Sequence, residues 1–266
     1  MDNLSNRTHS LFTSTVSGDV HGEPTIIGQN LTKLATTKSF AWIAGSMWLG
    51  RELKSPKTEK AIDLALRLLV DHGPYVSGAV NTMITARAGK GMIDSLIAGL
   101  LTIGPRFGGA VNGAASVWFD SVGEGHDPSV VVEDFARRKE YIPGIGHRKY
   151  RVDSPDPRVP LLTELARGLK HPHLDFALAV EELTTAKKPN LILNVDGALA
   201  AVMLDLLIEK EAFQKNEIET LIKSEFFNAL FISSRAIGFI AHYLDQKRLG
   251  EPLFRLSDNQ VLTTFI

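Results

Sequence analysis

The amino-acid sequence predicts an almost all-α fold, and three observations favour this prediction. Apolar residues recur at helical spacings through most of the 266-residue chain, as at Ile62, Leu66 and Leu69. The alternating pattern that is typical of strands does not appear after about residue 30. Glycine and proline pairs such as Gly73-Pro74 separate the helical stretches. The chain therefore reads as a series of helices joined by short breaks.

The first expected element is one short β-hairpin within residues 11–28, where Thr, Val and Ile stand between Gly and Pro. Helices are then expected over Phe40–Leu49, Glu59–Val70, Met92–Ile103, Val130–Arg138, Leu161–Leu169 and Leu174–Leu183. Ala198–Ile208 is apolar on almost all sides, which predicts a buried helix. Phe226–Leu249 predicts a long terminal helix. Most candidate site residues lie at the breaks, where loops present side chains.

The composition excludes several classes of function. A hydrophobic fraction of 44% suits a sizeable core, and a net charge of −1 argues against binding of nucleic acid or of a membrane surface. The absence of cysteine excludes disulfides, thiolate metal sites and cysteine nucleophiles, and it fits a cytoplasmic protein. The first residues lack the pattern of a signal peptide. Arg235 and His242 interrupt the longest weakly charged stretch, so no membrane span is expected.

The segment around His147 carries the strongest chemical signal. His147 follows the turn Pro143-Gly144-Ile145-Gly146, and basic residues and then Asp156-Pro157-Arg158 come after it. Glycines let a backbone approach a ligand closely, a histidine can move a proton near neutral pH, and arginine forks fit carboxylates. The segment predicts a loop that holds a polyanion and performs acid–base chemistry. A plain glycine-rich loop is the alternative.

Two further candidates have both a functional and a structural interpretation. Asp71-His72 follows an apolar helix directly, so these residues could simply engage the backbone at a helix end. Asp196 precedes the buried helix, where aspartate is a favoured N-cap. A partly buried carboxylate is also what a general base needs, so both interpretations of Asp196 can hold together.

Three cations are candidates for contact with an anionic ligand. Arg235 is the only formal charge within Phe226–Leu244, and an unpaired buried cation is costly. It therefore pairs within the protein, extends to the surface, or binds a substrate anion. Lys187 and Lys188 precede Pro189 and are either ordinary solvated charges or contacts for ligand phosphates.

Together these motifs resemble the citrate synthases. The resemblance rests on Gly144-Ile145-Gly146-His147 with Asp156-Pro157-Arg158, on Asp71-His72, on Asn194-Val195-Asp196 and on the helix Ser233–His242. It implies that His72, Arg158 and Arg235 hold substrate carboxylates, and that Asp196 handles the methyl proton of acetyl-CoA. A looser match implies that Arg255 reaches the active site of a partner subunit.

One position departs from the citrate synthase pattern. Those enzymes have a histidine that polarises the thioester carbonyl, whereas this chain has Phe107 there, beside Arg106. Either the register is off by one residue or another donor stabilises the enol. Both residues are taken as substrate-binding candidates, and direct enolisation of free acetyl-CoA should be harder than in citrate synthase.

Longer strings indicate a narrower group, the C-terminal citrate synthase-like module of ATP-citrate lyase and the citryl-CoA lyases that resemble it. These strings are Leu101–Gly109, Gly144–Arg148, Lys187–Gly197 and His242–Leu249, and the similarity covers about residues 13–256. It implies retro-aldol cleavage of (3S)-citryl-CoA to acetyl-CoA and oxaloacetate. The chain has no Gly-x-x-x-x-Gly-Lys-Ser/Thr loop and no room for an ATP-grasp domain, so a separate citryl-CoA synthetase is expected to supply the substrate.

The resemblance also implies roles and an architecture. His147 would take the proton of the C3 hydroxyl, and Asp196 would protonate the enolate carbon. Coenzyme A, which arrives as part of the substrate, would contact Gly144, Ile145, Gly146, Lys187 and Lys188. No metal and no permanently bound cofactor are expected. A large subdomain (1–107 and 226–266) and a small subdomain (108–225) would close over the substrate, in a homodimer or higher homo-oligomer.

Three alternatives remain at this point. A short citrate synthase would run the same chemistry towards citrate, although Phe107 argues against it. A non-catalytic oligomerisation module of an ATP-citrate lyase would be expected to lack His147 and Asp196, which are present. An all-α scaffold with chance glycine turns would not explain so many matching strings.

Overall fold

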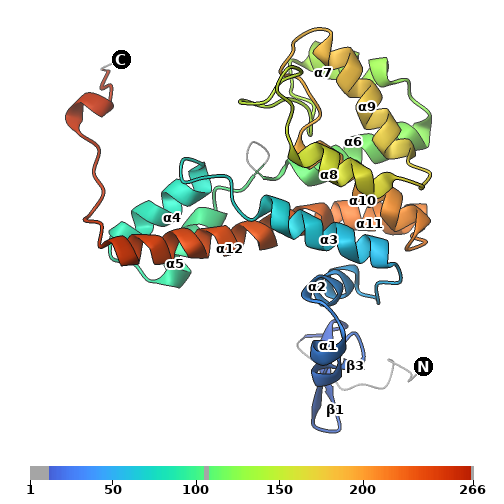
Figure 1. Ribbon diagram of the computed structural model, residues 1–266, viewed down its shortest axis with the longest axis horizontal. Coiled ribbons are helices and arrows are strands. Elements are labelled where there is room, and N and C mark those ends of the chain that lie inside the picture. Colours follow the sequence, from blue (N-terminus) through green and yellow to red (C-terminus); the bar gives the residue numbers. More distant parts are fainter. Residues whose placement is uncertain (1–11, 105–107, 265–266) are drawn as a thin grey trace.

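The computed structural model describes residues 12–104 and 108–264, and it confirms a mostly helical fold with a small N-terminal sheet (Figure 1). The strands are β1 (Ser17–Val20), β2 (Glu23–Ile26) and β3 (Gln29–Asn30). The helices are α1 (Leu31–Thr37), α2 (Phe40–Leu49), α3 (Pro56–Leu69), α4 (Ser77–Arg87), α5 (Met92–Leu100), α6 (Ala110–Glu124), α7 (Pro128–Arg138), α8 (Arg158–Thr163), α9 (Pro172–Thr185), α10 (Val195–Glu209), α11 (Lys215–Lys223) and α12 (Phe226–Leu249).

The N-terminal sheet has one more strand than the single hairpin that the sequence predicts. β2 pairs antiparallel with β1 and also with β3, in a register that places Thr25 opposite Asn30. Both connections are two-residue turns with positive φ, at His21-Gly22 and at Ile27-Gly28. Such turns match the twist of antiparallel strands. The sheet and α1 project away from the helical body (Figure 1).

The helical spacing pattern did not predict α1, α4, α6 or α11. In α4 the buried face consists of the small residues Gly78, Ala79, Thr82 and Ala86, so the large apolar side chains that mark a helix are absent. The predicted helix Leu161–Leu169 is also shifted. It begins at Arg158, becomes a 3₁₀ turn over Glu164–Ala166, and is followed by Gly168 at φ +75°.

Helix α10 forms the centre of the core, as its apolar sequence predicts. Its residues from Gly197 to Leu207 are almost completely buried, and it packs against α3, α6, α8 and α9. Asp205 is the acidic residue within this buried run, and it accepts hydrogen bonds from the backbone N–H groups of His173 and Leu174 at the start of α9. The same carboxylate contacts the His173 ring at 2.7 Å, so the buried charge is well satisfied.

Helix α12 joins the core to the arm that α4 and α5 form (Figure 1). Its side chain Phe239 fills the space next to Gly78 and Gly99, where an added Cβ would lie 2.1 and 2.9 Å from the ring. Gly238 lies equally close to the end of α3, because its Cβ would be 2.1 Å from the Val70 carbonyl oxygen. Small residues therefore let α12 run close to three other elements.

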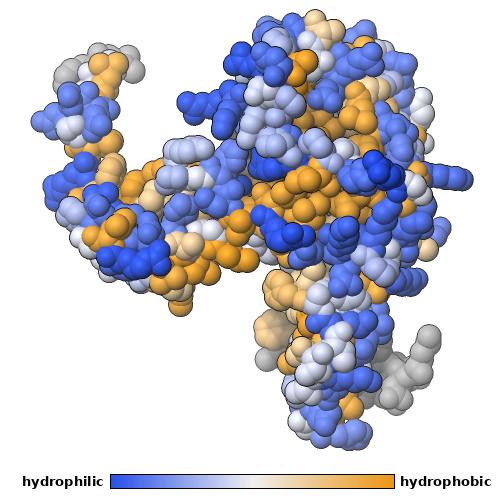
Figure 2. Space-filling view, viewed as in Figure 1, coloured by the Kyte–Doolittle hydropathy of each residue, from blue (hydrophilic) through white to orange (hydrophobic). Residues whose placement is uncertain are grey.

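Apolar side chains remain exposed on this arm. On α5, Ile93 is 74% exposed and Ile97 is 49% exposed, and Leu101, the C-cap of α5, is 79% exposed. On α12, Leu244 is 42% exposed. Figure 2 shows apolar residues gathered along the lower edge of the arm. No helix in the described part of the chain is both long and apolar enough to cross a membrane.

The loop that carries His147 packs against the first turn of α10. The Gly146 N–H donates to Ile192 (2.7 Å), and the His147 N–H donates to Asn190 (3.0 Å). Gly144 and Gly197 lie face to face, because a Cβ added to Gly144 would be 2.5 Å from the Cα of Gly197. Gly144 also has φ +83°, a conformation that disfavours other residues. The approach of the two backbones therefore requires glycine on both sides.

We expect Gly197→Ala to destabilise the protein. The new Cβ would lie 2.5 Å from the Gly144 carbonyl oxygen and 2.7 Å from Leu193 Cδ1. Overpacking of this kind lowers the free energy of unfolding by about 1–3 kcal/mol. Urea denaturation measures the change. The control is Gly123→Ala in α6, where nothing lies within 4 Å and alanine favours the helix. Equal stability of the two variants would contradict the tight contact.

Candidate active site

Five of the predicted site residues, distant in sequence, meet in one cavity of about 420 Å³. They are His72, His147, Arg158, Asp196 and Arg235. The other lining residues are Tyr75, Val76, Ser77, Gly108, Arg148, Asn194, Val195 and Phe231. Asp196 is the only acidic residue in this set of described residues, so the cavity combines several cationic or neutral donors with one carboxylate.

His72 lies in the turn between α3 and α4, and its neighbour Asp71 holds that turn. The Asp71 carboxylate accepts a hydrogen bond from the Gly73 N–H (2.9 Å) and contacts His242 Nε2 on α12 (3.0 Å). Asp71 therefore has the backbone role that its position after a helix suggested. His72 instead lines the cavity, with its ring 6.0 Å from that of His147.

The orientation of His147 defines where its proton lies. Its Nδ1 accepts hydrogen bonds from the backbone N–H groups of Lys149 (3.0 Å) and Tyr150 (3.1 Å). An Nδ1 that accepts cannot carry a hydrogen, so the neutral ring carries it on Nε2. His147 is therefore held as a hydrogen-bond donor at Nε2.

Both histidines are biased towards the neutral form. Burial lowers the pKa of His147, and the positive charges of Arg158 and Lys149 act in the same direction against an opposing effect of Asp156. Burial also lowers the pKa of His72, together with the charges of Arg158 and Arg235. At neutral pH each ring is an uncharged donor of one N–H group.

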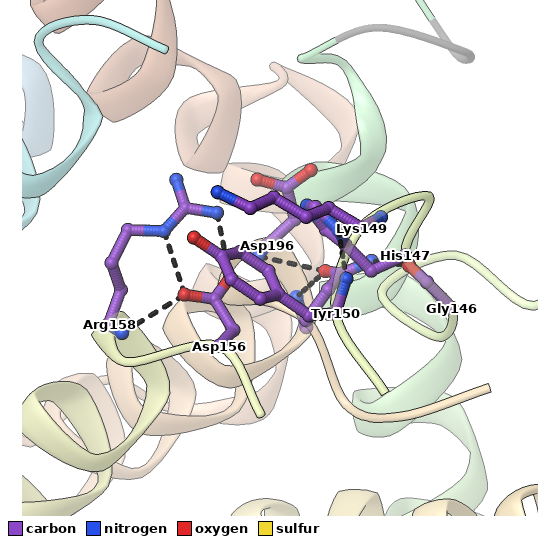
Figure 3. Close-up of polar contacts among 9 residues, drawn as sticks. Gly146, His147, Lys149, Tyr150, Asp156, Arg158 and Asp196 are labelled. Carbon is purple, nitrogen blue, oxygen red and sulfur yellow. Dashed lines mark hydrogen bonds and ion pairs between the residues drawn. The ribbon is translucent and has the colours of Figure 1, made fainter. Parts of the chain in front are cut away.

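Arg158, at the start of α8, is held by a fork of hydrogen bonds to Asp156 (Figure 3). Its Nε and one terminal nitrogen donate to the two carboxylate oxygens at 3.0 and 2.7 Å. Burial raises the pKa of Asp156, but the bonds and charge of Arg158 outweigh it, so the pKa lies below its usual range. A bidentate pair of this kind fixes the plane of the guanidinium.

Asp196 lies in the first turn of α10 and is not its N-cap, so that alternative is wrong. The cap is Asn194, whose Oδ1 accepts from the N–H groups of Asp196 (3.0 Å) and Gly197 (3.2 Å). The Oδ1 atom of Asp196 is buried and has no hydrogen-bond partner among the described residues. Burial raises the pKa of Asp196 to about 6, although Arg158 and Arg235 oppose the shift. An aspartate with this pKa can exchange protons near neutral pH.

Arg235 is almost fully buried in α12, and its Nε and Nη1 atoms have no hydrogen-bond partner among the described residues. The guanidinium stacks on the Phe231 ring, with 4.7 Å between its Cζ and the ring centroid. Within residues 12–104 and 108–264, no carboxylate forms an ion pair with Arg235, and its burial contradicts a snorkelling conformation. A buried cation with free donors next to a cavity is suited to bind an anion.

A second cavity of about 270 Å³ contains other predicted residues. Lys187, Lys188 and Ile145 line it together with the apolar residues Val132, Phe135, Ala136, Ile142 and Leu191. Ile145 lines this cavity and His147 lines the first, so one loop borders both. Gly144 and Gly146 form the backbone of that loop.

The remaining predicted residues are not placed in either cavity. Arg255 is exposed in the segment that follows α12 and lines neither cavity of its own chain. Arg106 and Phe107 lie outside the described residues, so their roles stay predictions.

Residue-by-residue prediction missed Asn194 and the α4 residues Val76 and Ser77, which also line the first cavity. The Ser/Thr/Asn/Asp preference of helix N-caps could have indicated Asn194, since it stands two residues before Asp196. The start of α4 gave no such signal, because Val76 is its N-cap residue and makes no side-chain cap.

Known proteins are similar to this chain in both sequence and fold. Residues 16–257 match the family described as the C-terminal domain of citrate synthase. A probable ATP-citrate synthase subunit 1 from Neurospora crassa is 44% identical over 253 residues, which cover 94% of this chain and 38% of that protein. A variant of Methanosaeta concilii ATP citrate lyase, solved with (3S)-citryl-CoA, has a TM-score of 0.93 and 40% identity, and the match covers 98% of this chain and 42% of that chain.

A shorter relative matches over nearly its whole length. The structure of citryl-CoA lyase from Hydrogenobacter thermophilus has a TM-score of 0.80 and 25% identity, over 97% of this chain and 95% of that chain. By contrast, this chain spans only about two fifths of the ATP-citrate relatives above. The match over residues 16–257 and the identity to these relatives establish that this chain belongs to the citrate synthase family.

Proposed function

We propose that this protein is a lyase that cleaves (3S)-citryl-CoA to acetyl-CoA and oxaloacetate. One observation carries the proposal. In the same cavity, Arg235 has two donor nitrogens and Asp196 has a buried carboxylate oxygen for which the described part of the chain offers no hydrogen-bond partner. A ligand that brings a carboxylate to the first and an exchangeable proton to the second would satisfy both groups. Citryl-CoA has two carboxylates and a hydroxyl. Of the relatives described above, one was solved in complex with (3S)-citryl-CoA and another is a citryl-CoA lyase.

The substrate carboxylates would bind to His72, Arg158 and Arg235. Arg235 offers two nitrogens that no described residue binds, whereas Arg158 already gives two bonds to Asp156 and keeps its remaining donors for the ligand. His72 is held neutral, so it would donate a single N–H group. Three converging donors fix the position of a dicarboxylate and align its C2–C3 bond for cleavage. Arg255 of a second copy could add a further cation, in line with the sequence resemblance.

The geometry of His147 favours a different role from the one that the sequence suggested. A neutral ring with its hydrogen on Nε2 cannot accept the hydroxyl proton at that atom. We therefore assign His147 as a donor to the oxygen on C3. Its hydrogen bond would stabilise that oxygen as it becomes the carbonyl of oxaloacetate.

Asp196 would then handle the proton in both halves of the reaction. As the C–C bond breaks, its carboxylate would take the proton of the C3 hydroxyl, and the electron pair of that O–H bond would form the carbonyl. The bond pair of the C–C bond would become the enolate of acetyl-CoA. The protonated Asp196 would return the same proton to the enolate carbon and form the methyl group. The proton count balances, and the carboxylate is regenerated.

The second cavity would bind the coenzyme A moiety. Its walls are mostly apolar, with Glu140 and Thr184 among them, and the exposed side chains of Lys187 and Lys188 suit phosphate groups. Because residues of the Gly144–His147 loop border both cavities, a thioester in the first could extend to a nucleotide in the second.

We also propose the two-subdomain architecture and self-association. His72 and Arg235 belong to the segments 1–107 and 226–266, whereas His147, Arg158 and Asp196 belong to 108–225, so the cavity lies between the two groups. Closure would exclude water from the thioester. The exposed apolar residues on α5 and α12 suit contact with a second copy, which sedimentation velocity would measure.

The direct test is to mix the purified protein with (3S)-citryl-CoA in the absence of ATP. We expect stoichiometric acetyl-CoA and oxaloacetate, with oxaloacetate followed through a coupled NADH-dependent reduction. A parallel incubation with acetyl-CoA and oxaloacetate should release no free coenzyme A beyond the background. Release of free coenzyme A in that incubation, without citryl-CoA cleavage in the first, would identify a citrate synthase instead.

Asp196→Asn should reduce kcat by roughly 10²–10⁴-fold, because it removes the group that moves the proton. The volume at the site is unchanged, so substrate binding measured by calorimetry should remain within a few fold. Asp120→Asn, on the exposed face of α6, removes the same charge outside the cavity and should keep full activity. Near-normal turnover by Asp196→Asn would refute the role of this residue.

The pH dependence of cleavage distinguishes a proton acceptor from a proton donor at Asp196. Its pKa is raised to about 6, so the carboxylate is mostly ionised at pH 7 and mostly protonated at pH 5. If it first accepts the hydroxyl proton, kcat/KM should level off above about pH 7 and fall below pH 6, approaching tenfold per unit. A kcat/KM that instead rises as the pH falls through 6 would mean that the protonated acid starts the reaction.

A further inference from the structure

Asn194 connects the two candidate catalytic residues through one side chain. Its Oδ1 accepts hydrogen bonds from the N–H groups of Asp196 and Gly197, at 3.0 and 3.2 Å. Its Nδ2 donates to the carbonyl oxygen of Gly146, the residue directly before His147, at 2.9 Å. Its backbone N–H donates to Gly144 at 3.0 Å. The residue therefore contacts the Asp196 turn on one side and the His147 loop on the other.

Helix capping alone does not account for an amide at this position. Serine and aspartate cap helices about as well as asparagine does, because capping needs only an acceptor. The amide group has an acceptor and a donor on one rigid plane, and an ionised carboxylate has no donor. The bond from Nδ2 to Gly146 is thus the feature that an aspartate at position 194 would lose.

Other groups hold the segment that precedes Asn194, which gives the bridge a firm base. The N–H of Leu193 donates to the Glu181 carboxylate of α9 at 2.8 Å, and Thr184 Oγ1 donates to the Leu191 carbonyl at 2.7 Å. Ile145 and Leu193 also pair as an isolated β-bridge. The His147 loop is therefore attached to a segment that α9 already immobilises.

We propose that Asn194 is a positioning residue that sets the placement of His147 relative to Asp196. This inference rests on the proposed function, in which the first residue binds the C3 oxygen and the second moves the proton. Without the amide bridge, the His147 loop would lose its side-chain tie to α10 and keep only backbone bonds. Displacement of about 1 Å in a catalytic group can reduce turnover by on the order of 10²-fold.

The test compares two asparagine N-caps in the same chain. Asn194→Ser keeps a capping acceptor but is too short to bridge to Gly146. Asn30→Ser does the same at α1, where Asn30 Oδ1 accepts from Lys33 and Nδ2 donates to Glu23, outside the cavity. We expect Asn194→Ser to lower kcat for citryl-CoA cleavage by on the order of 10²-fold with KM within about threefold. Asn30→Ser should keep wild-type kinetics, and both variants should have similar melting temperatures.

Hydrogen exchange provides a readout that does not depend on activity. The amides of Gly146 and His147, which donate to Ile192 and Asn190, should exchange at least tenfold faster in Asn194→Ser than in the wild type. Unchanged exchange would show that Asn194 does not hold the loop, and faster exchange with normal kcat would show that the loop position does not limit turnover. Either result overturns the inference. If the wild type fails to cleave citryl-CoA, the proposed function fails, and the exchange comparison still decides whether Asn194 holds the loop.

Discussion

The close packing of the Gly144–His147 loop against the first turn of α10 is the constraint on which the site depends. Gly144 and Gly197 leave no room for a Cβ between the two backbones. This contact brings a loop that follows α7 next to a helix that begins about fifty residues later in the chain. His147 and Asp196 reach the same cavity because each stands near one of these glycines in sequence. A backbone contact, rather than a contact of large side chains, thus sets the position of the candidate catalytic groups.

The two arginines of the cavity differ in how far carboxylates of the protein neutralise their charge. Asp156 accepts from two of the five N–H donors of the Arg158 guanidinium, so this arginine is held rigidly and its charge is paired, while its other donors remain for a ligand. Arg235 has no comparable partner among the residues that the structure describes, so its burial is unfavourable unless an anion binds to it. Asp196 provides part of the compensating charge, since Arg158 and Arg235 both act on its pKa. A dicarboxylate ligand would supply the anionic partner that Arg235 needs.

The sequence predicted those parts of the fold that large apolar side chains determine. The spacing of Ile62, Leu66 and Leu69 identified α3, and the apolar run after Asp196 identified the central helix. The prediction failed for α4, because its buried positions are small residues. They let neighbouring elements approach the helix backbone closely. Periodicity methods detect large apolar groups, so a helix with a face of glycine, alanine and threonine is invisible to them.

The sequence predicted which residues form the site, but not which nitrogen of His147 carries the proton. Sequence motifs and family resemblance named the five residues that meet in the cavity, because reacting groups belong to short recognisable strings. They did not reveal that two backbone N–H groups, from Lys149 and Tyr150, occupy Nδ1 of His147. Residue types do not reveal backbone hydrogen bonds of this kind, because almost any residue can donate its N–H group. It nevertheless decides whether the histidine gives or takes a proton.

Burial then acts in opposite directions on the two kinds of group and makes them complementary. Removal from water disfavours every charged form, so it lowers the pKa of His147 and raises that of Asp196 to about 6. At neutral pH the histidine is an uncharged donor, while the aspartate is still an ionised acceptor within about 1 pH unit of its pKa. An aspartic acid with the ordinary pKa of about 4 is a stronger acid, so its carboxylate would be a weaker base towards the hydroxyl, although the protonated form would give its proton to carbon readily. The raised pKa makes Asp196 a better base for the hydroxyl, and the retained ionisation keeps it ready to accept, so one residue can serve both proton transfers.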